Sequence, residues 1–279
     1  KSAKMFHDAL VPFAERRIII MKKRIGVVAA GIVLVIVIAI VVMVQINNPH
    51  KVVFEDKTMA ELIAKNVGVE SVDKLRIEDL EKIEILNIGY TGYYDTLVDI
   101  EKCSNLKRII IGYPQYTMAY YAFAGREMPA PESKERVKQI EKELESILEK
   151  CPDLEDIYIS NEGGNCKLDN IEFLKKGKNL GAICLFYQSD IDYSVISECT
   201  KLQFLSLHCC DISDLSMIGG LENLDSLVLT GTNVSEATDI LKLKNLSFFR
   251  IADTPLAENE EQLNLIQKQF PELKIETEY

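Results

Sequence analysis

The sequence contains no tryptophan and only three histidines, together with 14 glycines and 8 prolines among 279 residues. So little glycine and proline excludes a collagen-like or low-complexity chain. Histidine occurs at positions 7, 50 and 208, so a nucleophilic triad in the body of the chain would have to use His208, with Cys184 or Cys209 as nucleophile. No G-x-S-x-G, H-E-x-x-H or P-loop stretch is present. We therefore predict that the protein is not an enzyme, with a hydrolase using His208 as an alternative.

Cysteine is present in an odd number, with seven residues and no CxxC-like pair. A zinc site needs four convergent ligands, which commonly come in such pairs. We therefore predict no metal and no cofactor. An odd count without a clear disulfide framework favours free thiols, even for a protein outside the cytoplasm.

Acidic residues outnumber basic ones beyond the N-terminal segment. The whole chain has a net charge of -11; residues 1–44 contain seven Lys or Arg and two acids, hence +5, so the remainder has -16. Nucleic-acid binding depends on clustered cations that neutralise phosphates. An acidic body without such clusters excludes a nucleic-acid partner.

One stretch has no charged residue at all: residues 25–44, "IGVVAAGIVLVIVIAIVVMV". Twenty residues of helix span about 30 Å, the thickness of the hydrocarbon core of a bilayer, so the stretch predicts a transmembrane helix. Five Lys or Arg residues lie at 16–24, before the helix, whereas Lys51 alone lies close after it. This bias predicts that residues 1–24 form a cytoplasmic basic tail and that 45–279 are extracytoplasmic, as in a signal anchor.

Two features of this N-terminal region have alternatives. A cleaved signal peptide would make the protein secreted, although "VMVQINN" offers no A-x-A-like cleavage site. The sequence begins with Lys1, which is consistent with a fragment of a longer chain. Met21 of "MKKRIG" is an alternative natural start. In the second case residues 1–20 do not belong to the mature protein.

The remainder of the chain is organised by a period of 22 residues, seen most clearly at Leu180, Leu202, Leu224 and Leu246. From each start the pattern apolar-x-x-apolar-x-apolar recurs, as in Leu202/Leu205/Leu207, and weaker copies begin at 83, 106, 154 and 273. Alternation with period two predicts a strand with one buried face in each unit. No unit can bury its apolar residues alone, so the units are expected to stack into one continuous core.

These residues resemble a leucine-rich-repeat protein of the short, bacterial internalin-like kind. The resemblance implies an α/β solenoid over 45–279, with a parallel sheet on the concave face and short helices or irregular segments on the convex face. It implies an N-terminal cap at 52–82, with a strand and a helix, and a C-terminal cap at 255–279. The sequence departs from the family through an insertion at 113–150, where "ESKERVKQIEKELESILEK" predicts an amphipathic convex helix over 132–150. It also departs at the ladder position, usually Asn, which is here Cys166, Gln188, Cys210, Thr232 and Thr254.

This register assigns the cysteines to structural positions. Cys103, Cys151 and Cys199 each precede the first leucine of a unit by three residues, in an apolar column, and two more are at the ladder position. The register places the last two, Cys184 and Cys209, on the concave face. Because Cys103 and Cys151 lie in one column on adjacent units, they are the one pair to test for a disulfide.

The outward strand positions are rich in aromatic side chains. Exposed aromatic clusters are typical anchors of protein–protein contacts. We therefore predict recognition of a protein or a cell-surface polymer through the concave face; the alternatives are aromatic stacking that only stabilises the sheet, and a cell-envelope scaffold without a specific ligand. The predicted ligand-binding residues are Tyr90, Tyr113, Tyr158, Phe186, Tyr187, Phe204, His208, Phe248 and Arg250.

Overall fold

The computed structural model describes residues 51–112 and 127–278, and residues from Val52 onward form one compact unit. The predicted basic tail at 1–24 and membrane helix at 25–44 lie outside the described residues, as does the first part of the insertion. Among the described residues, no helix combines the length and the apolar character needed to cross a bilayer.

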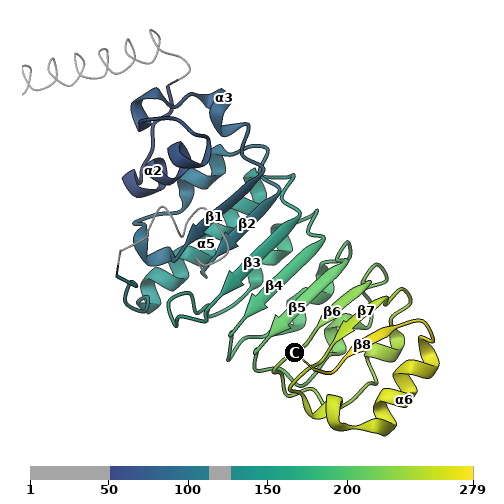
Figure 1. Ribbon diagram of the computed structural model, residues 1–279. Helices are drawn as coiled ribbons and strands as arrows, with labels where there is room; N and C mark the ends of the chain where they lie inside the picture. The colour runs from purple at the N-terminus through teal and green to yellow at the C-terminus, as the bar shows by residue number, and fades with distance from the viewer. Residues whose placement is uncertain (1–50, 113–126, 279) are drawn as a thin grey trace, which may run out of the picture. The chain divides into compact units, whose positions relative to one another are not determined.

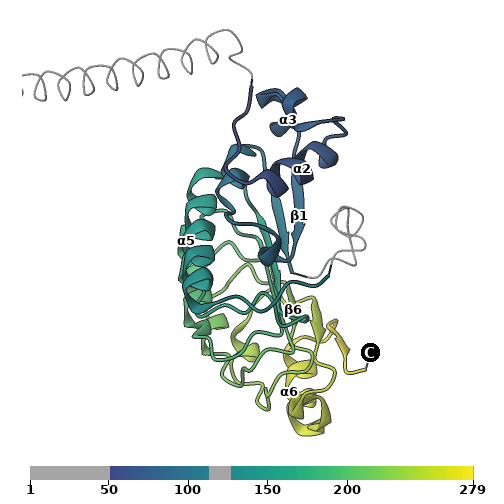
Figure 2. The same cartoon turned by 90° about the vertical axis from the view of Figure 1, so that its left-hand side faces the viewer.

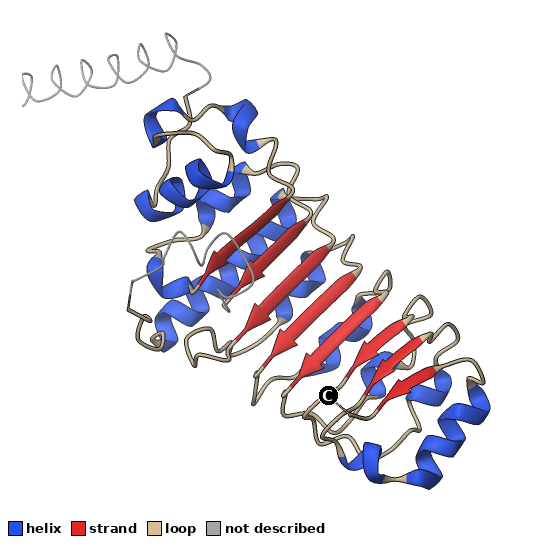
Figure 3. Cartoon of the chain, in the orientation of Figure 1, coloured by secondary structure: helices blue, strands red, loops and turns tan. Residues whose placement is uncertain are grey.

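The architecture is a single sheet of parallel strands stacked in chain order (Figures 1 and 3). This arrangement confirms the α/β repeat fold predicted from the 22-residue period. The strands are β1 (Ile85–Gly89), β2 (Arg108–Ile111), β3 (Asp156–Ser160), β4 (Ala182–Phe186), β5 (Phe204–His208), β6 (Ser226–Val228), β7 (Phe248–Arg250) and β8 (Lys274–Glu276).

The pairing register of the strands is the register of the sequence repeat. Leu205 of β5 pairs with Ile183 of β4 on one side and with Leu227 of β6 on the other. Phe249 of β7 continues the same column, and all four side chains are fully buried. The core therefore consists of side chains at equivalent strand positions, and each of them packs against the equivalent side chains of the two neighbouring units. This stacking is what the spacing of the leucines predicts.

The other side of the core is covered by the return segments, which are short 3-10 helices in most units. Between β2 and β3 the longer helix α5 (Lys134–Lys150) takes this place, with Ser133 as its N-cap, so it begins two residues later than predicted. Val137, Ile140 and Leu144 are among its buried residues. Figure 2 shows α5 along one side of the sheet. The 3-10 helices are η2 (Thr91–Tyr93), η3 (Val98–Lys102), η5 (Glu172–Lys176), η6 (Tyr193–Glu198), η7 (Ser216–Ile218), η8 (Ile240–Lys242) and η9 (Pro255–Glu258).

Two columns of polar side chains close the turns at the two ends of the strands. The ladder residues are buried: the amide group of Gln188 donates to the carbonyl of Cys166 at 3.1 Å and accepts from the N–H of Leu168 at 3.1 Å. At the opposite ends of the strands, Asn179 and Asn245 each donate to the carbonyl of a residue in the preceding unit, both at 2.7 Å. The Gln188 bonds satisfy backbone groups that would otherwise be buried and unpaired, whereas the asparagine bonds join neighbouring turns at the surface.

Short helices precede the first strand and follow the seventh. The N-terminal group consists of α2 (Lys57–Asn66), η1 (Val72–Lys74) and α3 (Ile77–Leu80). The strand expected in the cap is reduced to single-residue bridges at Lys51 and Arg76. The carboxylate of Asp99, which is fully buried, accepts from the backbone N–H groups of Glu55 and Asp56, and so attaches the start of α2 to η3. At the other end, α6 (Glu260–Gln269) leads into β8.

Candidate functional site

The concave face is the side of the sheet opposite α5 and the 3-10 helices (Figure 2). Side chains alternate between the core and this face along each strand. In β5, for example, Leu205 and Leu207 are buried in the core, whereas Phe204 and His208 are partly exposed on the concave face.

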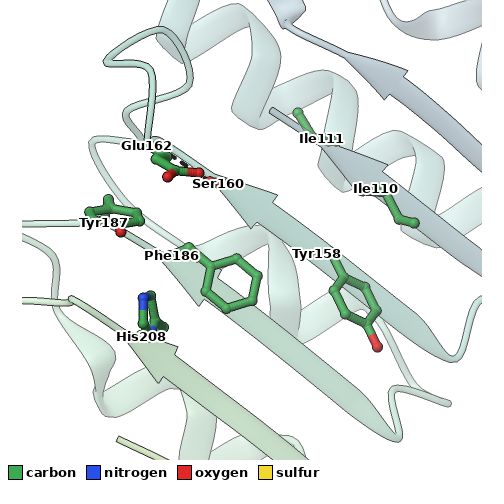
Figure 4. Close-up of a pocket in the computed structure, with 8 residues that line it drawn as sticks. All are labelled: Ile110, Ile111, Tyr158, Ser160, Glu162, Phe186, Tyr187 and His208. Carbon is green, nitrogen blue, oxygen red and sulfur yellow. Dashed lines mark hydrogen bonds between the residues drawn. The ribbon is translucent and has the colours of Figure 1, made fainter. Parts of the chain in front are cut away.

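A hollow of about 470 Å³ lies on the concave face over the ends of strands β2 to β5 (Figure 4). Four of the predicted binding residues meet there: Tyr158, Phe186, Tyr187 and His208. The sequence prediction missed the other four lining residues, which are Ile110, Ile111, Ser160 and Glu162.

The imidazole of His208 packs against two aromatic rings, those of Phe186 and Tyr187. It meets Phe186 edge-to-face at 5.9 Å and 70°, and Tyr187 at 5.5 Å and 79°. Both arrangements are those that aromatic quadrupoles favour. Partial burial lowers the pKa of His208, and the carboxylate of Glu162 acts weakly in the opposite direction. The hollow therefore presents a neutral imidazole at pH 7.

Tyr187 has this position because of an unusual backbone conformation. Its φ is 56°, and the equivalent residues of the next units, Cys209, Gly231 and Asp253, have φ of 50°, 71° and 54°. This left-handed residue follows strands β4 to β7 and directs the chain toward the ladder residue. Tyr187 is 37% exposed, so its ring forms part of the accessible edge of the hollow.

The other side of Tyr158 borders a polar depression of about 560 Å³. Arg108 lies there, with its Nε 2.7 Å from Oδ2 of Asp156 and its guanidinium 5.6 Å from the centre of the Tyr158 ring. Burial raises the pKa of Tyr158 to about 12, so the hydroxyl is protonated. Phe204 also lines this depression, with Glu155, Asn179, Gly181, Ala182, Lys201, Gln203 and Asp225.

Among the remaining predicted binding residues, Tyr90, Phe248 and Arg250 line neither of the two recesses. Tyr90 is only 7% exposed, so it contributes no accessible ring. Tyr113 falls outside the described residues. Phe248 and Arg250 are on β7, where the guanidinium lies 5.7 Å from the ring and its Nε donates to Glu276 at 2.7 Å.

All seven cysteines have free thiols in this structure, including Cys103 and Cys151. Burial raises the pKa of Cys103 and Cys184 to about 12 in each case. Cys184 was expected to be on the concave face, but it is 1% exposed, because the larger Tyr158 lies beside it in the register. No group of three or more His, Cys, Asp or Glu residues within 51–112 and 127–278 is placed to hold a metal ion.

A scan against protein-family models and a search of curated proteins found no match to the chain. Among solved structures the chain is similar to internalin C2 of Listeria monocytogenes, with 17% identity and a TM-score of 0.46 over 72% of this chain and 86% of that one. It is also similar to the internalin inlF of the same species, with 19% identity and a TM-score of 0.49 over 80% of this chain and 63% of that one. For InlP of Listeria monocytogenes the values are 17% and 0.44, over 72% of this chain and 58% of that one.

Proposed function

We propose that this protein is a recognition module outside the cytoplasm, which the helix at 25–44 holds at the membrane with the N-terminus inside. Its repeat domain binds a protein or a cell-surface polymer through the concave face. The proposed contact residues are the nine predicted ones, except Tyr90, with Tyr158, Phe186, Tyr187 and His208 at the centre. The function is binding and not catalysis.

The aromatic hollow is the observation that supports this proposal most strongly. A solvated sheet face does not need a group of aromatic and aliphatic side chains, and such groups on a surface are typical of binding sites. The hollow is also preformed, because β3, β4 and β5 are each paired on both sides. A partner would therefore bind with little cost for ordering this surface.

A photo-crosslinking experiment in intact cells tests the binding role of the hollow. A photoreactive benzoyl-phenylalanine replaces Tyr187 in the full chain, or, as the control, Leu265, an exposed apolar residue on α6. We expect a specific adduct from position 187 and none from position 265. Equal adducts from both positions, or none from either, would contradict the proposal.

Stability measurements distinguish binding from a scaffold role. In the double variant Phe186→Ala/Tyr187→Asn, asparagine is chosen because it tolerates the left-handed backbone of position 187. If the hollow serves recognition, the variant loses the adduct formed from a probe at Phe204 and keeps the melting temperature within a few degrees. If the aromatic residues only stabilise the sheet, the melting temperature falls and the adduct persists.

The proposed topology needs its own test. Glu236 is exposed, and Glu236→Cys in a Cys209→Asn background adds a surface thiol to the loop after β6. A membrane-impermeant maleimide added to intact cells should label this thiol if residues 45–279 are extracytoplasmic. Labelling only after lysis would place the domain in the cytoplasm.

A further inference from the structure

The charges around the two recesses indicate which kind of partner fits them. Among the described residues that line the hollow, Glu162 is the one acidic residue, and none is Lys or Arg. The depression on the other side of Tyr158 has three acids, Glu155, Asp156 and Asp225, and two bases. Together the recesses contain four acids and two bases, which is a net charge of -2.

The two bases already have partners. Arg108 is held by Asp156, and the ammonium of Lys201 donates to Oδ1 of Asn179 at 2.6 Å. In the part of the chain that the structure describes, no Lys or Arg forms an ion pair with Glu155, Glu162 or Asp225. We refer to these three residues as the acidic rim.

The acidic rim therefore has carboxylates on both sides of the apolar hollow that form no ion pair with any described Lys or Arg. A lysine or arginine beside the hollow would find a carboxylate without displacing an existing pair, whereas an anionic group would meet repulsion from the rim and from the -16 of residues 45–279. His208 does not oppose a cationic partner, because its imidazole is neutral at pH 7.

We infer that the partner is a protein segment in which an aromatic or aliphatic side chain enters the hollow of Tyr158, Phe186, Tyr187 and His208, while a flanking lysine or arginine contacts the acidic rim. This inference rests on the proposed function and makes it more specific, since it selects a cationic protein segment over an anionic surface polymer.

The test uses a library of random twelve-residue peptides displayed on phage and selected on the full chain in a non-ionic detergent. Peptides whose binding is lost in Phe186→Ala/Tyr187→Asn define the set that uses the hollow. Their affinities are then measured for a rim variant, Glu155→Gln/Glu162→Gln/Asp225→Asn. The matched control, Glu236→Gln/Glu258→Gln/Glu272→Gln, removes the same charge from exposed acids outside the strands.

We expect the peptides that use the hollow to contain Lys or Arg next to an apolar residue. Their Kd should rise about tenfold in the rim variant and less than about twofold in the control, because rim contacts are local and partly screened. Added salt should weaken binding to the unmodified chain and have little effect on the rim variant.

Peptides that use the hollow but have acidic or uncharged flanks would overturn the inference, as would cationic peptides with the same Kd for the rim variant. Either result leaves the proposed function standing. A selection that yields no peptide dependent on the hollow also overturns the inference, and the crosslinking experiment at Tyr187 then decides the proposed function independently.

Discussion

Truncation of a core leucine tests the stacked-unit architecture on which the binding face depends. Leu205 is fully buried in β5, in register between Ile183 and Leu227. Leu205→Ala removes three carbon atoms and leaves a cavity that the flanking strands can fill only in part. We expect the free energy of unfolding to fall by about 3 kcal/mol, within the usual range of about 2–5 kcal/mol for such a change.

A double-mutant cycle tests whether Leu205 is coupled to its neighbour in the core and not to a distant unit. Leu227→Ala truncates the adjacent position in the same column, whereas Leu86→Ala truncates the equivalent position in β1, which is also fully buried. Four strand spacings of about 4.8 Å put β1 about 19 Å from β5. The distant pair should be additive within about 0.5 kcal/mol, whereas the adjacent pair shares one cavity and should lose at least about 0.5 kcal/mol less than the sum.

Urea denaturation followed by circular dichroism measures these changes, with the slope of each transition as a check on two-state behaviour. A loss below about 1 kcal/mol for Leu205→Ala would contradict the buried position of this side chain. Coupling of Leu205 to Leu86 as strong as its coupling to Leu227 would contradict a core in which each unit contacts only its neighbours.

Three further predictions concern the strand ends beside the hollow. With a thiol-specific chromophore at about pH 8, native protein should react at one site, Cys209, because it is the one partly exposed cysteine. Burial raises the pKa of all seven thiols, so the difference in exposure decides which of them reacts. Denatured protein should show seven reactive thiols, and Cys209→Asn should abolish the native reaction. The lowered pKa of His208 means that the unfolded chain binds its proton more tightly, so this residue's contribution to stability is complete above its ordinary pKa of 6.5 and is lost as the pH falls below it. The unfolding free energy should therefore drop less between about pH 7.5 and about pH 5.5 in His208→Gln than in the unmodified chain, and equal drops would exclude this role. Gly231→Ala should cost about 1–2 kcal/mol or more, because φ is 71° and a Cβ would lie 2.7 Å from Sγ of Cys209, whereas Gly220→Ala, with nothing within 4 Å, should be close to neutral.

The sheet could be predicted from the sequence because an error of register has a large physical cost. A shift of one residue would turn Ile183 and Leu185 out of the core and bring Cys184 and Phe186 in. The apolar pattern must therefore recur at the same place in every unit, so it can be recognised in the amino-acid sequence alone. The N-terminal cap lies before the first repeat, where no such constraint acts, and the strand expected there is reduced to single-residue bridges at Lys51 and Arg76.

The candidate site was less predictable, because the repeat pattern predicts the face toward which a side chain is directed but not how exposed that side chain is. Cys184 is directed toward the concave face but is covered there by Tyr158, and Tyr90 is buried at the end of β1. Comparison of side-chain sizes along each register column would have indicated the first case. It would also have identified Ile110, the register partner of Tyr158 on β2. Glu162 follows β3 in a turn, where the repeat has no period-two signal.

The same alternation separates stability from recognition in this fold. Leu185 and Leu207 fill the core, while their neighbours Phe186 and His208 line the hollow, so each strand supplies both functions through adjacent positions. Outward substitutions change which partner fits and leave the core columns intact, provided that they respect the ring contacts around His208. A chain of this kind can therefore acquire a new partner by replacement of a few outward residues on β2 to β5, without any change in the 22-residue spacing that determines its fold.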